Sequence, residues 1–341
     1  MSTRVEVRPD RTPAATPLLA VEDLRVRFAT EDGPVAAVNG VSFELAPGEI
    51  LALVGESGCG KSVTAMAVPG LLPPTATVTG SIRLEGRDLL AMPPRELRDV
   101  RGKEISFVFQ EPMTSLNPAF TVGRQVREVL QRHEGLSKKA AQQRAVELLD
   151  LVRIPAPQQR VDDYPHQMSG GMRQRVMIAI GVACGPKVLI ADEPTTALDV
   201  TIQAGVLDIM RDLRSQLGTA IVLITHDLGV VADLADRVVV MYAGRPVEQA
   251  EVHELFAAPQ HPYTVGLLHA IPHREKGVDE VAGTRLAEIP GMVPLLRDDP
   301  DECVFAPRCD RSTSVCTQHR PPLAPTRPAH LAACYHPGEQ P

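Results

Sequence analysis

The sequence lacks tryptophan, and aromatic residues make up only 3% of its 341 positions. It also lacks any apolar run near the roughly 20 residues that a membrane-spanning helix needs. The formal charge of −7 gives no positive balance to attract a nucleic-acid backbone, and the scarcity of aromatic rings disfavours stacking on bases. Residues 1–17 contain arginine and proline but no apolar core, so we expect a disordered tail rather than a signal peptide or an anchor. These shortages favour a cytosolic protein that meets a membrane only through a partner.

The length exceeds one typical domain and indicates a large α/β domain followed by an extension. After about residue 254 the composition becomes rich in proline and histidine and the pattern becomes irregular. We therefore expect one domain over residues 18–253, with a helical subdomain at about 111–183, and an extension over 254–341. Strands are predicted within residues 18–48 and at 80–84, 105–109, 188–191, 221–225 and 237–248, the last as a terminal hairpin.

A glycine-rich segment, Gly55 to Ser62, follows an apolar run and leads into a helix-compatible stretch. It reads G-x-x-x-x-G-K-S, which in this context predicts a phosphate-binding loop. Its glycines let successive N–H groups face one concavity at a helix N-terminus, which suits the phosphates of ATP or GTP. Lys61 would reach the β- and γ-phosphates, and the Ser62 hydroxyl would bind Mg²⁺. The nucleotide-binding residues expected here are Gly55, Glu56, Ser57, Gly58, Cys59, Gly60, Lys61, Ser62 and Val63.

Two carboxylates, Asp192 and Glu193, end the apolar run at residues 188–191. Ligands of open α/β sheets bind beyond the carboxyl ends of the strands, so both acids should face the nucleotide. Asp192 is suited to hold Mg²⁺, directly or through water, and Glu193 is suited to polarise the attacking water. A surface turn with two acids is the alternative, which the buried-type strand and the phosphate loop disfavour.

Ser169, Gly170 and Gly171 stand where a helix is expected to begin, and alone they would indicate no more than a capped loop. Together with the phosphate loop and the acidic pair, they resemble the signature of ATP-binding cassette (ABC) ATPases. Met168 is the one departure, at a position where leucine is common. Further landmarks of that family follow in the expected order over about residues 18–250, namely Phe28, Gln110, Asp199 and His226.

The resemblance implies a role for each landmark. Gln110 matches the glutamine that contacts Mg²⁺ or water and acts in catalysis with Glu193. His226 matches the switch histidine that contacts the γ-phosphate, and Asp199 belongs to the D-loop. Phe28 is at about the position of the aromatic residue that stacks on adenine. The family also implies ATP and Mg²⁺ as cofactors and an α/β P-loop core: a mostly parallel sheet with an antiparallel β subdomain and a helical subdomain.

The resemblance further implies that a single chain cannot complete its own site. In cassette ATPases the signature of one subunit closes on the nucleotide held by the phosphate loop of another, and hydrolysis reopens the pair. We therefore expect a second ABC ATPase subunit, two transmembrane permease subunits and an external solute-binding protein. The segment 111–118 would contact a permease, although by itself it reads as an ordinary loop bounded by prolines.

A narrower resemblance covers nearly the whole chain. Residues 109–118, 261–272 and 289–294 look like segments of dipeptide, oligopeptide and nickel importer ATPases. So does the Cys-rich extension, whose cysteines are Cys303, Cys309, Cys316 and Cys334.

Four thiolates gathered in a small volume need a metal charge to offset them. Their spacing has no paired C-x2-C knuckles, as zinc usually has, and is not a ferredoxin run, so spacing alone leaves Zn²⁺, an iron–sulfur cluster and reduced free thiols open. The family resemblance favours a [4Fe-4S] cluster, with Zn²⁺ as the alternative. We expect His319, His330 and His336 to face solvent or to surround the ligands.

These observations together predict the ATP-hydrolysing subunit of a peptide importer, located peripherally at the cytoplasmic face of the cell membrane. An ATPase for import of nickel or another small solute is the first alternative. A non-transport ABC ATPase acting on ribosomes or DNA is the second. The sequence does not name the solute, and it does not say whether the second ATPase subunit is identical or paralogous.

Overall fold

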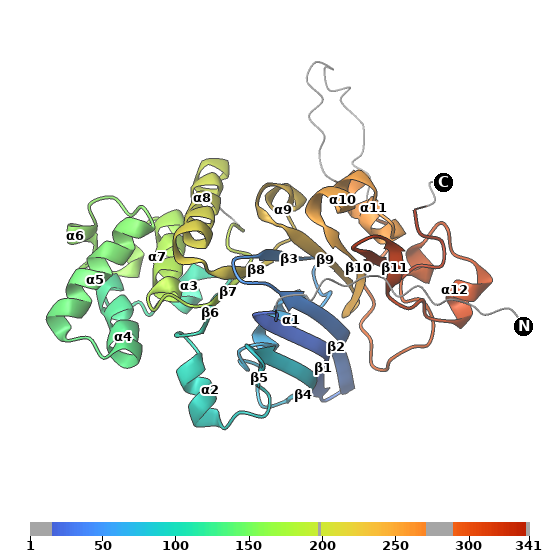
Figure 1. Cartoon of the computed structure of the whole chain (residues 1–341), viewed down its shortest axis with the longest axis horizontal. Coiled ribbons are helices and arrows are strands. Elements are labelled where there is room, and N and C mark those ends of the chain that lie inside the picture. The colour runs from blue at the N-terminus through green and yellow to red at the C-terminus, as the bar shows by residue number, and fades with distance from the viewer. Residues whose placement is uncertain (1–15, 197–198, 271–288, 339–341) are drawn as a thin grey trace, which may run out of the picture.

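The computed structural model describes residues 16–196, 199–270 and 289–338, so most of the predicted N-terminal tail and part of the extension lie outside the described residues. Two sheets and a group of helices make up the fold. The helices of residues 122–182 gather at one end of the molecule, and the C-terminal segment lies at the other (Figure 1). The arrangement confirms the predicted α/β class.

The larger sheet has eight strands with a parallel centre. In spatial order these are β11 (Ala324–Arg327), β12 (His330–Ala332), β10 (Arg245–Glu251), β9 (Arg237–Tyr242), β3 (Ile50–Val54), β8 (Ala220–Ile224), β7 (Val188–Asp192) and β6 (Ile105–Val108). The five strands from β9 to β6 pair in parallel, and every residue of β3, β7 and β8 is buried. Continuous apolar runs of this kind are typical of strands covered on both faces.

The smaller sheet is antiparallel and confirms the predicted β subdomain. Its order is β2 (Gly33–Leu45), β1 (Leu19–Thr30), β4 (Ala76–Leu84) and β5 (Arg87–Asp88). The strands expected within residues 18–48 are thus two long strands of one hairpin, of 12 and 13 residues.

Helices fill the expected helical region and connect the strands. They are α1 (Lys61–Ala67), α2 (Pro94–Val100), α3 (Pro112–Ser115), α4 (Val122–Glu134), α5 (Lys138–Leu151), α6 (Pro157–Arg160), α7 (Gly170–Val182), α8 (Val200–Leu217), α9 (Leu228–Leu234), α10 (Val252–Ala257), α11 (Pro262–His269) and α12 (Ser314–Gln318). Short 3₁₀ turns occupy Pro165–Gln167 and Ala306–Arg308. Side chains of Thr121, Ser137 and Asp199 cap α4, α5 and α8 by accepting N–H bonds in the first turn.

The C-terminal segment is more regular than its composition indicated, and the hairpin of β9 and β10 is not terminal. Strand β12 pairs antiparallel with β10, so the extension adds two strands to the large sheet. A buried cluster fastens this junction: Glu248 accepts N–H bonds from Gln260 at 2.6 Å and His261 at 2.9 Å, and its carboxylate lies 2.6 Å from His330 Nε2. Expecting His330 near solvent or around the cysteine ligands was wrong, because its ring is buried against the acid of the neighbouring strand.

Candidate active site

The segment from Gly55 to Gly60 forms a tight loop between β3 and α1. Gly55 has a φ of +148° and Gly60 a φ of +88°, values that side-chain-bearing residues rarely adopt. A Cβ atom on Gly55 would lie 2.3 Å from the Met241 carbonyl oxygen, and one on Gly60 would lie 2.4 Å from the Ala37 carbonyl oxygen. The close approach of the surrounding backbone explains why glycine is required at both positions.

Lys61 is held inside this loop. Its Nζ donates to the Gly55 carbonyl at 2.7 Å and to the Glu56 carbonyl at 2.8 Å, and its side chain is buried. Burial lowers the pKa of the ammonium, and nearby acids oppose that shift. The ammonium is therefore placed at the loop where it can exchange these carbonyls for phosphate oxygens.

Asp192 and Ser62 come together from β7 and α1. The Ser62 hydroxyl donates to Asp192 Oδ1 at 3.0 Å, although the two residues are 130 positions apart. Burial raises the pKa of Asp192, and the neighbouring Glu193 raises it further. A hydroxyl and a carboxylate beside the phosphate loop are the oxygen ligands that Mg²⁺ prefers, so the donor set fits that ion.

Glu193 contacts side chains that follow two neighbouring strands of the large sheet. Its Oε2 accepts hydrogen bonds from Gln110 Nε2 and Thr196 Oγ1, both at 2.8 Å, and its Oε1 lies 3.2 Å from His226 Nδ1. Its φ is +46°, a left-handed conformation that is uncommon for a residue with a side chain and often marks a functional position. Gln110, Glu193 and His226 thus lie together at the carboxyl ends of β6, β7 and β8.

The remaining predicted residues lie outside this group. Ser169 and Gly170 are exposed at the start of α7, where the Ser169 hydroxyl accepts the Met172 N–H at 3.3 Å. A Cβ on Gly171 would lie 2.4 Å from Ile202, so the signature packs tightly on α8. Among the described residues, no hydrogen bond or ion pair joins residues 169–171 to the phosphate loop.

Asp199 and Phe28 have structural contacts of their own. Asp199 caps α8 by accepting the Ile202 N–H at 2.9 Å. Phe28 is half-buried on β1, where it pairs with Val35 of β2 and Ala76 of β4. Neither residue lies in the cluster around Glu193.

Sequence reasoning missed the contacts that the C-terminal segment makes with the phosphate loop. Tyr263 accepts the Glu56 N–H, and Arg308 pairs with the Glu56 carboxylate. The partners are 207 and 252 residues apart, and no local pattern connects them. Only the fold brings them together.

All four cysteines predicted as ligands line one cavity, together with His261 and His336. The surroundings raise the pKa of three of these thiols. Burial raises the pKa of Cys303 and Cys309, and burial with neighbouring cysteines raises that of Cys334 to about 11. In the part of the chain that the structure describes, no three His, Cys, Asp or Glu side chains converge closely enough to hold one metal ion.

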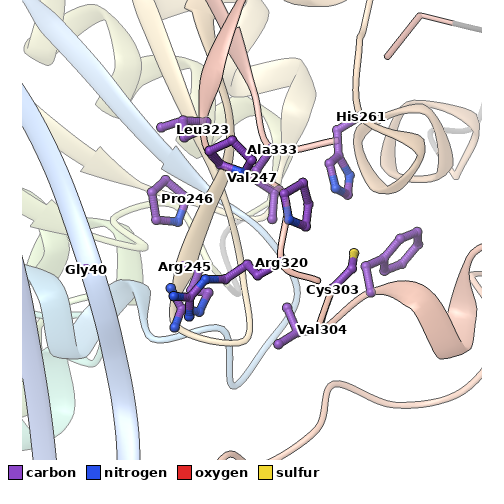
Figure 2. A pocket seen from close by; sticks show the side chains of 13 residues that line it. Gly40, Arg245, Pro246, Val247, His261, Cys303, Val304, Arg320, Leu323 and Ala333 are labelled. Carbon is purple, nitrogen blue, oxygen red and sulfur yellow. The ribbon is translucent and has the colours of Figure 1, made fainter. Parts of the chain in front are cut away.

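A second cavity, of about 170 Å³, lies between β10 and the extension, and Cys303 and His261 also line it (Figure 2). Arg245 and Arg320 point toward each other in this cavity, and both pair with Asp299. Burial lowers the pKa of Arg245 to about 10, and Arg320 and Arg25 add to the shift. This polar junction joins the extension to the large sheet.

Within the described ranges, none of the helices combines the length and the apolar character needed to cross a membrane.

Comparison with known proteins gives consistent matches along the chain. Residues 38–196 match the ABC transporter family, and residues 247–316 match a family described as oligopeptide/dipeptide transporter, C-terminal region. A probable peptide ABC transporter ATP-binding protein of Sinorhizobium fredii is 51% identical, over 98% of this chain and 99% of its own length. The oligopeptide transport ATP-binding protein OppD of Salmonella typhimurium is 49% identical over 96% of each chain.

A solved structure supports the same assignment. A dimeric ATP-binding cassette in a post-hydrolysis state, with ADP and phosphate bound, is 25% identical to this chain and superimposes with a TM-score of 0.63, over 69% of this chain and 98% of its own. The fold, the cluster around Glu193 and the nearly full-length similarity agree. The chain belongs to the ABC transporter ATPases, in the family of oligopeptide and dipeptide transport ATP-binding proteins.

Proposed function

We propose that this chain hydrolyses ATP to drive the import of di- or oligopeptides by a membrane ABC transporter. The observation that carries the proposal is the convergence of Gln110, Glu193 and His226 beside the Ser62–Asp192 pair. Similarity to peptide and oligopeptide transport proteins over nearly the full length supports peptides as the solute. Nickel or another small solute is the alternative for the same machinery.

In the proposed reaction, residues 55–63 hold the phosphates of ATP, and Phe28 stacks on the adenine. Lys61 neutralises charge on the β- and γ-phosphates. Ser62, Asp192 and Gln110 would bind Mg²⁺, which offsets the charge that develops on the transferred phosphoryl group. Glu193 accepts the proton of the attacking water, and His226, 3.2 Å from its carboxylate, contacts the γ-phosphate.

Two chains are proposed to share each nucleotide. Ser169, Gly170 and Gly171, with Asp199 of the D-loop, would complete the site of a second ATPase subunit. The exposure of Ser169 and Gly170 supports this arrangement, as does the dimeric state of the similar cassette. An N-terminus of α7 that faces outward can place its first N–H groups on the γ-phosphate bound by another chain.

The four cysteines are proposed to hold an iron–sulfur cluster in the extension. They line one cavity, and the resemblance of this extension to that of peptide and nickel importer ATPases favours a cluster over a single Zn²⁺. Burial raises the pKa of Cys303, Cys309 and Cys334, so thiolates at these positions require a positive group beside them. When bound, the cluster would supply that charge and crosslink a segment that is poor in apolar core.

We place the ATPase domain at residues 18–253, with its helical subdomain at about 111–183, and the extension at 254–341. Two large apolar side chains near the helical subdomain, Phe109 and Met113, are 42% and 60% exposed. Their exposure supports residues 111–118 as the contact for a permease subunit. The chain would then act peripherally at the cytoplasmic face of the membrane, beneath two permeases and an external solute-binding protein.

The test is purification of the tagged chain from its native membrane, followed by uptake measurements in vesicles. We expect permease subunits and a second ATPase to copurify, and labelled peptides to enter only with ATP. Nickel uptake without peptide uptake would select the alternative solute. A chain that copurifies only with ribosomes or DNA would contradict transport altogether.

A further inference from the structure

The C-terminal extension contacts the phosphate loop through a buried arginine. Arg308 donates from Nη1 to Glu56 Oε2 at 2.7 Å and from Nη2 to Glu56 Oε1 at 3.0 Å. The guanidinium is itself fixed, because it donates to the carbonyls of Ile289 and Pro290 and lies 5.6 Å from the centre of the Tyr242 ring. Only 6% of the Arg308 side chain is exposed, against 30% of the Glu56 side chain, so the two-pronged pair is partly shielded from solvent.

A second residue of the C-terminal segment contacts the same loop residue. The hydroxyl of Tyr263, on α11, accepts the Glu56 N–H at 2.7 Å and lies 3.8 Å from Cys59 Sγ. The Tyr263 side chain is fully buried, and its ring packs against the rings of Tyr242 and Phe305. Both the backbone and the side chain of Glu56 are therefore held from outside the loop.

The third polar group of Glu56 connects these contacts to the nucleotide site. Its carbonyl oxygen accepts a bond from Lys61 Nζ at 2.8 Å. The Glu56 N–H thus donates to Tyr263, and its carboxylate and carbonyl accept hydrogen bonds from Arg308 and Lys61. A shift of Glu56 would move the groups that position Lys61.

We propose that Arg308 and Tyr263 are positioning residues of the ATP site, through which the C-terminal extension sets the affinity of the phosphate loop for ATP. The inference rests on the proposed ATP-binding function of this loop. A loop whose N–H groups must point into one concavity binds phosphate better when its conformation is fixed beforehand. The extension supplies that fixation from residues more than 200 positions away in the sequence.

The same geometry couples the cysteines to ATP. Arg308 ends the 3₁₀ turn Ala306–Arg308 and directly precedes Cys309. The Ala306 N–H donates to the Cys303 carbonyl at 2.9 Å. A group that orders Cys303 and Cys309 would therefore also hold the Arg308 guanidinium in place. Loosening the cysteine segment should weaken ATP binding even though none of its cysteines touches nucleotide.

The test measures the affinity of the full-length chain for ATP by displacement of the fluorescent analogue methylanthraniloyl-ATP. We expect Arg308→Gln to weaken ATP binding about tenfold, which is about 1.4 kcal/mol. Glu56→Gln should give a similar loss, and the double variant should be little worse than either single one, because both remove the same pair. Arg308→Lys should retain part of the affinity, since one ammonium cannot make the two-pronged contact. The control is Arg297→Gln, an exposed arginine of the same extension, which should bind ATP like the unchanged chain.

A second measurement separates positioning from a merely structural role. In the assembled transporter, Arg308→Gln should raise KM for ATP about tenfold and leave kcat within about twofold. Unchanged ATP affinity in Arg308→Gln, or fully additive losses in the double variant, would overturn the inference. If Arg308→Gln does not fold, Tyr263→Phe and Glu56→Gln test the same inference, because each removes one contact between the extension and the phosphate loop. Normal ATP affinity in both variants would overturn the inference equally. Failure of the unchanged chain to bind ATP would instead count against the proposed function.

Discussion

Replacing Glu193 by glutamine should stop ATP turnover while ATP still binds. The carboxylate accepts bonds from Gln110 and Thr196 on one oxygen and faces His226 on the other. A glutamine oxygen can accept the first two bonds, and its amide can donate to a neutral imidazole nitrogen. The left-handed backbone at this position is no more strained for glutamine than for glutamate. The site keeps its shape and loses one negative charge and one proton acceptor.

Loss of a positioned general base typically lowers a rate by about 10² to 10⁴, or roughly 3 to 5 kcal/mol in the activation barrier. We expect phosphate release by the assembled transporter to fall by that factor, while ATP affinity stays within about threefold. The assay follows phosphate release and nucleotide binding on the same preparation. Glu31→Gln, an exposed acid in the turn between β1 and β2, is the matched control. Turnover within threefold of the unchanged chain would remove Glu193 from its catalytic role.

Further predictions concern stability and the cysteine segment. Gly55→Ala should lower the free energy of unfolding, measured in urea, by about 2 kcal/mol more than Gly58→Ala does. Both glycines have a positive φ, but only a Cβ on Gly55 would clash with backbone. Equal losses in the two variants would contradict this explanation. Glu248→Ala should lower the free energy of unfolding by about 3 to 5 kcal/mol, because it leaves the buried His330 and two N–H groups without their carboxylate acceptor. A loss under 1 kcal/mol would show that Glu248 does not stabilise the junction. Protein purified without oxygen should contain iron and acid-labile sulfide that substitution of the four cysteines by serine removes, and stoichiometric zinc in their place would refute the cluster.

The nucleotide site could be predicted from the sequence because each of its parts is local. The phosphate loop follows β3 directly, the acidic pair ends β7, and Gln110 and His226 follow β6 and β8. Parallel strands bring their carboxyl ends to one edge, so the end of β7 was enough to place Asp192 and Glu193 at the nucleotide. Gln110 and His226 were assigned to the same site through the resemblance to ABC ATPases.

The role of the C-terminal segment could not be predicted in this way. Strand β12 has only three residues, too few for an alternating pattern, and its pairing with β10 is fixed by the fold. No local pattern indicates that His330 is buried against Glu248, 82 positions away. Arg308 likewise stands in a proline-rich stretch, and its contact with the phosphate loop depends on tertiary structure alone.

The central claim is that each nucleotide is bound between two chains. It is tested most directly by measuring the ATPase rate per chain over a wide range of concentrations, with and without the second ATPase subunit and the permeases. The rate of the isolated chain should fall toward zero on dilution and recover in the assembled transporter. A diluted, isolated chain that hydrolyses ATP at the full rate would contradict the shared site.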